Sequence, residues 1–450
     1  MWYLYEDGFW RAIEPYDQQL LNGAGRRIAE HYDVVWAEKR KVIWDHMSHN
    51  WDLMLDPADL NVEPYLVCEN GTLDVRTGEL LPHSPEHMTT RKIDIEHRAG
   101  ATCPEWVKML DDMLDNLPAK ERQQTIDTLQ EWFGIALLGG AAQHIPRALR
   151  QALFLYGPPY TGKSTVLNVL QRIIGINRVV RASVHDVNSN FGLAAFIGAG
   201  AWITEEVAGG SDKPVDTARL KCLITGEAVN VSRKFDTDVP LRFCGPVAWA
   251  ANSVPNFMES SAALYERIMV CELERSFTKA EARARFGSLK PEDWLEMKDE
   301  YPGILQWAIE GYQRAIKRGE FDPPAHMRAA GESLREQNDP IFAFLTDCCE
   351  EDPSVANSAA TLSYTAMAYI KQQHGSTPRR KKIASELKAA IPGVFRNARL
   401  DRENAVSGKP RRHRYEGLRL NKSGLRYFAA AQTDYDGASD LTANDPLLGG

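Results

Sequence analysis

The sequence has few cysteines and no long apolar run. Its seven cysteines are scattered except for Cys348-Cys349, and no pair has the CxxC spacing of a zinc ribbon. We therefore expect reduced, buried thiols rather than a metal site or a disulfide framework. No stretch approaches the roughly 18 apolar residues that cross a bilayer, and the first residues lack the basic start of a signal peptide. These absences favour a cytoplasmic protein.

Acidic residues outnumber basic ones in the chain, 61 to 53, but the basic residues are concentrated in one segment. The chain has a net charge of −8, whereas residues 371–426 carry 16 lysine and arginine residues against 4 acidic ones. Such a segment can neutralise phosphates locally even when the rest of the protein is acidic. It predicts a C-terminal nucleic-acid-binding module, with an ordinary solvated basic surface as the alternative.

The pattern GxxxxGK[ST] is present in full. Its residues are Gly157, Pro158, Pro159, Tyr160, Thr161, Gly162, Lys163 and Ser164, followed by Thr165. An apolar run precedes the pattern and a helical pattern follows it, which is the strand, loop and helix order of a phosphate-binding loop. Backbone N–H groups and the helix N-terminus would surround the phosphates. Lys163 is expected to reach the β- and γ-phosphates, and the Ser164 hydroxyl to bind Mg²⁺.

A second apolar segment, residues 201–204, ends in two carboxylates, Glu205 and Glu206. A buried strand that delivers acids beside the loop supplies a ligand for Mg²⁺ and a base that orients water. We assign metal contact to Glu205 and water activation to Glu206, and the reverse assignment stays open. A solvated turn is the other interpretation of two acids at a strand end.

Residues 229–235 alternate between apolar and polar side chains, which predicts a strand. Arg233, Lys234 and Phe235 lie at the end of this segment, and Lys221 lies before it. A hairpin tip with this composition could bind a phosphate and stack on a base of single-stranded DNA. The alternative is an exposed hairpin whose lysine faces water.

Two further polar residues lie next to apolar strands. A strand over residues 246–251 ends at Asn252, whose amide is positioned to sense the γ-phosphate or the attacking water. Arg267 precedes a final apolar strand and could reach the nucleotide of a neighbouring subunit as an arginine finger.

In this order the motifs resemble those of the superfamily 3 helicases of the AAA+ class. Among these helicases, they resemble most the helicase part of the phage and plasmid primase-helicases that are related to the poxvirus enzyme. The resemblance is carried by residues 157–164, Glu205, Glu206, Leu220-Lys221, Thr225-Gly226-Glu227, Arg233-Lys234, Asn252 with Pro255, and Arg267. Residues 70–79 and 103–106 resemble the family's N-terminal helicase-associated region, and residues 302–311 resemble the helix after its motor. Two features depart from the family: Glu266-Arg267 stands where paired arginines are common, and no primase domain precedes the motor.

The resemblance implies an ATP- and Mg²⁺-dependent replicative DNA helicase of a phage or mobile element, in the cytoplasm of the host cell. It implies a homo-hexameric ring that moves along single-stranded and forked DNA. Because this sequence shows no primase domain, either a separate primase and polymerase cooperate with it, or the sequence is a fragment of a longer protein. Two alternatives stay open: a non-translocating AAA+ remodelling ATPase, and a sequence-specific origin-binding replication initiator or repressor with a degenerate motor.

The predicted fold is α/β, with an AAA+ P-loop motor, a mainly helical N-terminal region and a C-terminal winged-helix domain. The predicted segments are a helicase-associated region 1–100, a helical collar or oligomerisation segment 101–145, the ATPase motor 146–320, a linker 321–339, the basic winged-helix DNA-binding domain 340–428 and a flexible tail 429–450. Near the N-terminus we expect a hairpin around Asp7-Gly8 and a helix over residues 16–47.

Basic residues are expected at two places in the winged-helix domain. The recognition helix would start near Arg379, Arg380, Lys381 and Lys382, and the wing would carry Lys409, Arg411, Arg412 and Arg414.

Overall fold

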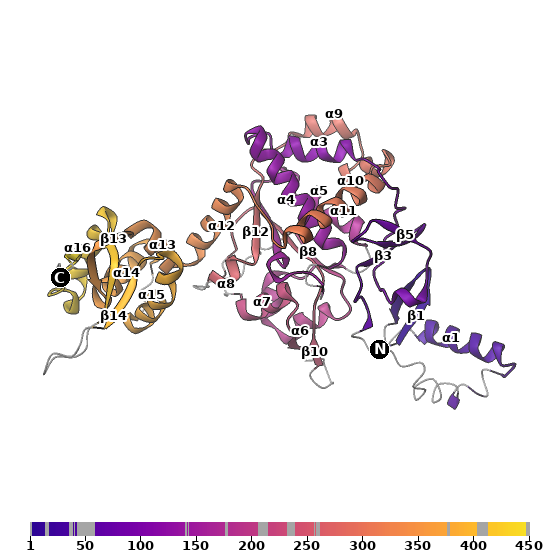
Figure 1. Ribbon diagram of the computed structural model, residues 1–450, viewed down its shortest axis with the longest axis horizontal. Helices are drawn as coiled ribbons and strands as arrows, with labels where there is room; N and C mark the ends of the chain where they lie inside the picture. Colours follow the sequence, from indigo (N-terminus) through magenta and orange to yellow (C-terminus); the bar gives the residue numbers. More distant parts are fainter. Residues whose placement is uncertain are drawn as a thin grey trace. The chain divides into compact units, whose positions relative to one another are not determined.

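A computed structural model gives the structure of the chain (Figure 1). It describes residues 2–13, 18–35, 39, 41–42, 59–139, 142, 144–175, 179–205, 215–231, 239–255, 257, 262–375, 379–402 and 413–446. The chain divides into two units. We call Met1–Gly209, Ala218–Ser253 and Val270–Met327 the larger unit, and Gly210–Thr217, Val254–Met269 and Arg328–Gly450 the smaller unit. No helix of the described residues is long and apolar enough to cross a membrane.

The described residues before position 100 include five short strands and one α-helix, where the sequence had suggested a mainly helical segment. These elements are β1 (Trp2–Glu6), β2 (Phe9–Ile13), α1 (Gln18–His31), β3 (Tyr65–Cys68), β4 (Gly71–Asp74) and β5 (Glu79–Leu81). β1 and β2 form the predicted hairpin, and its turn residues Asp7 and Gly8 both have positive φ, 48° and 85°. Two positive φ values suit the twist of a hairpin. α1 ends at His31, well before residue 47, and β3, β4 and β5 form a separate antiparallel sheet.

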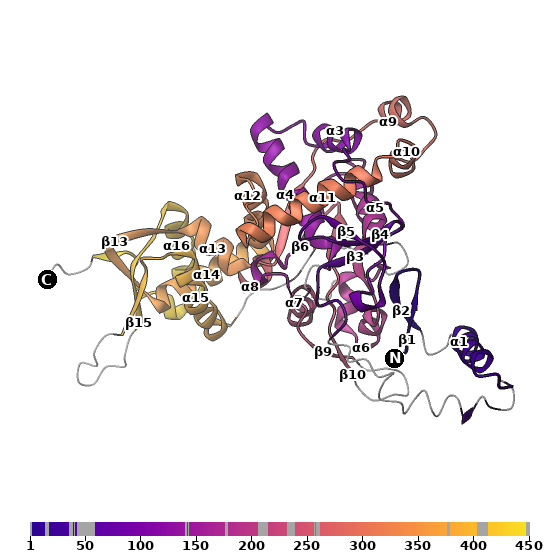
Figure 2. The same ribbon diagram turned by 45° about the vertical axis from the view of Figure 1, so that its right-hand side comes forward.

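Two long helices pack closely in the larger unit. They are α4 (Ala119–Leu137) and α11 (Tyr301–Arg318), with the shorter α3 (Pro104–Met113) beside α4 (Figure 2). A Cβ at Gly134 would collide with the backbone of Tyr312, and one at Gly311 with the backbone of Gln130. Glycine therefore lets the two backbones approach each other.

A five-stranded sheet forms the centre of the larger unit. In chain order its strands are β6 (Ala152–Tyr156), β7 (Val179–Val180), β8 (Ala201–Thr204), β11 (Val247–Ala251) and β12 (Ile268–Glu272). In space the order is β12-β6-β11-β8-β7, and the pairs β6–β11, β11–β8 and β8–β7 are parallel. β8 and β11 are buried along their whole length and β6 is buried except at Tyr156, as expected of central parallel strands. Their carboxyl ends therefore meet at one edge of the sheet.

Further helices and strands lie between and after the strands of this sheet in the sequence. They are α5 (Lys163–Ile174), α6 (Asn190–Leu193), α7 (Thr217–Thr225), β9 (Val229–Val231), β10 (Val239–Leu241), α8 (Ala262–Tyr265), α9 (Lys279–Phe286) and α10 (Pro291–Met297). α5 packs on β8 and β11, and β9 pairs antiparallel with β10.

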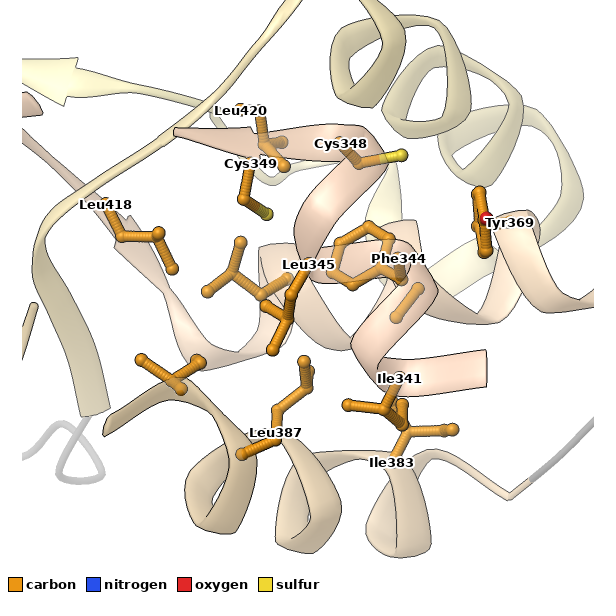
Figure 3. Close-up of a cluster of buried hydrophobic side chains, with 14 of the residues drawn as sticks. Ile341, Phe344, Leu345, Cys348, Cys349, Tyr369, Ile383, Leu387, Leu418 and Leu420 are labelled. Atoms are coloured by element: carbon orange, nitrogen blue, oxygen red, sulfur yellow. The ribbon is translucent and has the colours of Figure 1, made fainter. Parts of the chain in front are cut away.

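The smaller unit has a core of its own. Its elements are α12 (Ala325–Asn338, which begins in the larger unit), α13 (Pro340–Cys348), β13 (Cys349–Ser358), α14 (Ala359–His374), α15 (Arg380–Val394), β14 (Arg399–Arg402), β15 (His413–Leu420), α16 (Lys422–Asp434) and β16 (Asp445–Pro446). The strands form an antiparallel sheet in the order β14-β15-β13-β16. Figure 3 shows Phe344 and Leu345 of α13 packed with Leu387 of α15 and Leu418 of β15.

Two segments differ from the sequence prediction. The predicted linker 321–339 is mostly helix, because the turn at Pro323-Pro324 is short and strong helix formers follow it in α12. Residues 429–446 of the predicted flexible tail 429–450 are ordered. Asn444 holds them in place: its side chain accepts from Leu420 N–H (2.7 Å) and donates to Leu420 O (2.8 Å), and its N–H donates to the buried Asn357 side chain (2.8 Å).

Candidate functional site

The phosphate-loop pattern lies between β6 and α5, as the sequence predicted. Gly157 and Gly162 both have positive φ, 142° and 92°. A Cβ at Gly157 would collide with the carbonyl oxygen of Leu273, and one at Gly162 with the side chain of Met113. Both positions therefore require glycine, for backbone conformation and for space.

Lys163, the first residue of α5, is buried and turned into the loop. Its ammonium group donates to the carbonyl oxygens of Gly157 (2.7 Å) and Pro158 (2.6 Å) and to the Thr161 hydroxyl (3.2 Å). Burial lowers the pKa of Lys163 from its ordinary value. The loop thus encloses a positive charge next to a helix N-terminus, where an anion is favoured.

Ser164 and Glu205 meet beside the loop. The Ser164 hydroxyl donates to the Glu205 carboxylate at 2.9 Å, although 41 positions separate them in sequence. Glu205 directly follows β8, and both side chains are solvent-exposed. A hydroxyl and a carboxylate are oxygen ligands of the kind that Mg²⁺ prefers. Glu206 lies outside the described residues.

Asn252 follows β11, which lies between the loop strand β6 and the acidic strand β8. Its side chain is exposed at the same sheet edge. Behind this edge the buried Trp202 and Trp249 rings pack edge to face, with centroids 5.3 Å apart. The aromatic pair holds β8 and β11 against each other, and with them the positions of Glu205 and Asn252.

The remaining loop residues divide by exposure. Pro158, Pro159 and Tyr160 are exposed, Thr161 is buried, and Thr165 is half-buried in the first turn of α5. Tyr160 has φ of 64°, a left-handed conformation that is disfavoured for a residue with a side chain.

The segment after β12 makes contacts with the phosphate loop that the sequence patterns did not predict. The Ser276 hydroxyl donates to the carbonyl oxygen of Pro159 (2.9 Å), and the Phe277 N–H donates to that of Tyr160 (2.8 Å). No motif marks these residues, because their partners are main-chain atoms far away in sequence.

Other predicted residues lie elsewhere. Arg267 belongs to the smaller unit, donates to the carbonyl oxygen of Ala263, and has a buried Nε without a hydrogen-bond partner among the described atoms. Lys221 is a half-buried residue of α7. β9 and β10 pair antiparallel, but Arg233, Lys234 and Phe235 between them lie outside the described residues.

The C-terminal basic residues are partly described. Arg379, Arg380, Lys381 and Lys382 are all exposed at the start of α15. The Arg380 guanidinium lies over the Tyr364 ring (5.1 Å to the centroid) and donates to its hydroxyl (3.2 Å). Arg414 is half-buried in β15, whereas Lys409, Arg411 and Arg412 lie outside the described residues.

With this geometry established, comparisons with known proteins give two family matches. Residues 3–115 match a family model described as D5 N terminal like. This family is found in primase-helicase proteins of phages and viruses. Residues 155–267, which include the phosphate loop and Glu205, match a family described as of unknown function.

Solved structures of the NrS-1 C terminal region are also similar. The A form apo structure is 13% identical over 84% of this chain and 90% of that chain, with a TM-score of 0.39. Another apo structure of the same region is 14% identical with the same coverage and TM-score. A search of the curated proteins found no match.

Proposed function

We propose that this protein is an ATP-dependent DNA helicase of superfamily 3, built around an AAA+ motor, that acts in replication of a phage or mobile element. The observation that carries the proposal is the contact between Ser164 and Glu205 (2.9 Å) beside the buried Lys163. These side chains come from the N-terminus of α5 and the end of β8, at the sheet edge where open α/β sheets bind ligands. The match of residues 3–115 to the D5 N terminal like model supports the same assignment.

Each residue of the site has a distinct role in the proposal. Lys163 would leave the loop carbonyls and bind the β- and γ-phosphates of ATP, while Ser164 and Glu205 would hold Mg²⁺. Bound Mg²⁺ would neutralise charge on the phosphates. Glu206, or Glu205 in the reverse assignment, would orient the attacking water. Asn252 would bind the γ-phosphate or that water.

Assembly and DNA binding belong to the same proposal. Arg267 would act on the nucleotide of a neighbouring copy in a hexameric ring, and the hairpin tip with Lys234 would follow single-stranded DNA.

The smaller unit is proposed as a winged-helix DNA-binding domain. Its elements run α13, β13, α14, α15, then the β14–β15 hairpin, so that α15 takes the place of a recognition helix. The first turn of α15 carries exposed basic residues but no acidic residue and no side-chain cap, and Lys382 is ion-paired within the helix, with Glu386 (3.6 Å). Cations at the positive end of a helix are unfavourable unless an anion joins them, which supports a role in phosphate binding.

ATP hydrolysis tests the proposal. The parent protein should hydrolyse ATP with Mg²⁺, faster when single-stranded DNA is added, and Lys163→Ala should slow hydrolysis by about a hundredfold or more. Lys120→Ala, which removes an exposed lysine at the start of α4, is the matched control and should behave as the parent. Hydrolysis that DNA does not stimulate would favour the remodelling ATPase. Absence of hydrolysis in the parent would reject the motor and favour the origin-binding protein.

A further inference from the structure

The segment Leu273 to Phe277, here called the strap, continues from β12 alongside the phosphate loop. The Leu273 N–H donates to Tyr156 O (2.8 Å), and Ser276 and Phe277 bind the carbonyl oxygens of Pro159 and Tyr160. The three pairs have the same sequence separation, so strap and loop run in parallel and in constant register. The loop is therefore attached along its length to a neighbouring segment.

This attachment determines where the N–H groups of the loop point. In a trans peptide the C=O and N–H bonds point in opposite directions. Because the carbonyls of Pro159 and Tyr160 face the strap, the N–H groups of Tyr160 and Thr161 in the same peptide units point away from it. Pro158 and Pro159 carry no N–H. After Gly157, the first backbone N–H groups that the loop can offer to a ligand are therefore those of Tyr160 and Thr161, and the strap orients both.

The strap also holds a disfavoured conformation in place. Tyr160 has φ of 64°, and its ring is 71% exposed, so little packing of its own side chain stabilises that conformation. The hydrogen bond from Phe277 N–H to the Tyr160 carbonyl does stabilise it. Strained backbone at a functional site persists where the surroundings enforce it.

Arg275 anchors the strap to the end of α3. Its guanidinium donates to Asp112 O (2.8 Å), forms an ion pair with Asp115 (2.9 Å), and lies over the Phe277 ring (4.6 Å). The same helix end contributes Met113, which contacts Gly162. α3 therefore supports the loop directly and through the strap.

We propose that the strap is a positioning element of the nucleotide site, in which Ser276 and the Phe277 N–H hold the Tyr160 and Thr161 N–H groups toward the phosphates of the bound nucleotide. The inference rests on the proposed function, because it requires that the loop binds a nucleoside triphosphate. It adds Ser276, Phe277 and Arg275 to the residues on which that binding depends.

The test measures the affinity of the full chain for Mg-ATP and for inorganic tripolyphosphate, together with the melting temperature without ligand. Ser276→Ala should weaken both affinities equally, by about three- to tenfold, the effect of one hydrogen bond. The melting temperature should stay close to that of the parent because the bond is exposed. Ser276→Thr keeps the hydroxyl and should restore both affinities. Ser288→Ala, an exposed serine beyond α9, is the matched control.

Arg275→Ala is a second variant that should lower the affinities for Mg-ATP and for tripolyphosphate by the same factor, because the strap acts on the phosphates and not on the adenine base. Parent-like affinities in Ser276→Ala and Arg275→Ala, with Lys163→Ala impaired, would overturn the strap proposal alone. A loss for Mg-ATP without a loss for tripolyphosphate would also overturn it. If Lys163→Ala also binds like the parent, the proposed function fails, and the strap proposal fails with it.

Discussion

Asp339 is a fully buried carboxylate whose charge should make stability depend on pH. It caps α13 by accepting from Ile341 N–H (3.1 Å) and Phe342 N–H (3.0 Å), and its partner Arg335 lies at 3.4 Å. Burial nevertheless raises the pKa of Asp339 from 3.8 to about 6. The folded protein thus binds this proton more tightly than the unfolded chain does.

The raised pKa of Asp339 therefore adds to the free energy of unfolding at low pH. This added stability is fully present below about pH 4 and is lost as the pH rises to about 6, a change of about 3 kcal/mol. Asp339→Asn keeps an oxygen for the cap and removes the titration. We predict that urea titrations from pH 4 to pH 6.5 show a smaller decline of the free energy of unfolding in this variant. Glu332→Gln, exposed on α12, should retain the decline of the parent. An unchanged slope in Asp339→Asn would contradict the assignment.

At the residue scale, the sequence predicted that a strand ending at Glu205 lies beside the phosphate loop, because an apolar strand pattern ends in that acid. The hydrogen bond between Ser164 and Glu205 came from the structure. The sequence did not predict the contacts of Ser276 and Phe277. Those bonds end on carbonyl oxygens, which every residue has, across a separation of 117 positions. Side-chain chemistry leaves a pattern in sequence, whereas main-chain contacts at long range leave none.

The helix pair α4 and α11 depends on glycine at its closest approach. Gly134 lies inside α4, where glycine would ordinarily cost about 1 kcal/mol relative to alanine. A Cβ there would collide with Ala308 O and Tyr312 N of α11. We predict that Gly134→Ala destabilises the larger unit by about 2 kcal/mol in urea titrations.

Gly331 in α12 supplies the matched control for this substitution. Its added Cβ would meet no atom of the described residues within 4 Å. Gly331→Ala should therefore stabilise the protein by about 0.5–1 kcal/mol through helix propensity and a less flexible unfolded chain. Equal effects at the two positions would show that helix packing is not the reason for Gly134.

The start of α15 should contribute to DNA affinity through phosphate charge. Lys381 is exposed there, next to Arg379, Arg380 and Lys382. If it contacts one phosphate, Lys381→Ala should weaken binding to duplexes of any sequence and reduce the slope of log K against log salt by about 0.9. Lys279→Ala, an exposed lysine at the start of α9, removes the same charge elsewhere. Identical slopes in both variants would contradict the role of α15.

Elements were predictable where local patterns agreed with long-range packing. The hairpin at Asp7-Gly8, the loop between β6 and α5, and helix α15 follow from turn residues or from the local sequence pattern. α12 was missed because its double proline outweighed the helix formers after it. The order of residues 429–446 was missed because it depends on Asn357 and Asn444, which meet only when the sheet has formed.

At the scale of the whole molecule, the uneven distribution of charge along the chain bears on the proposed DNA binding. Residues 371–426 gather 16 basic residues in a chain whose net charge is −8. A basic surface confined to one segment would bind DNA locally, leaving the acidic remainder free of non-specific contacts.

Strand displacement on a forked DNA duplex with ATP and Mg²⁺ tests the proposed helicase most directly. The parent protein should displace the strand, and a size measurement with and without nucleotide should show that it forms a ring. The Lys163→Ala variant should still assemble or bind DNA but should not displace the strand. A parent protein that stays a monomer and leaves the fork intact while ATP is present would contradict the account.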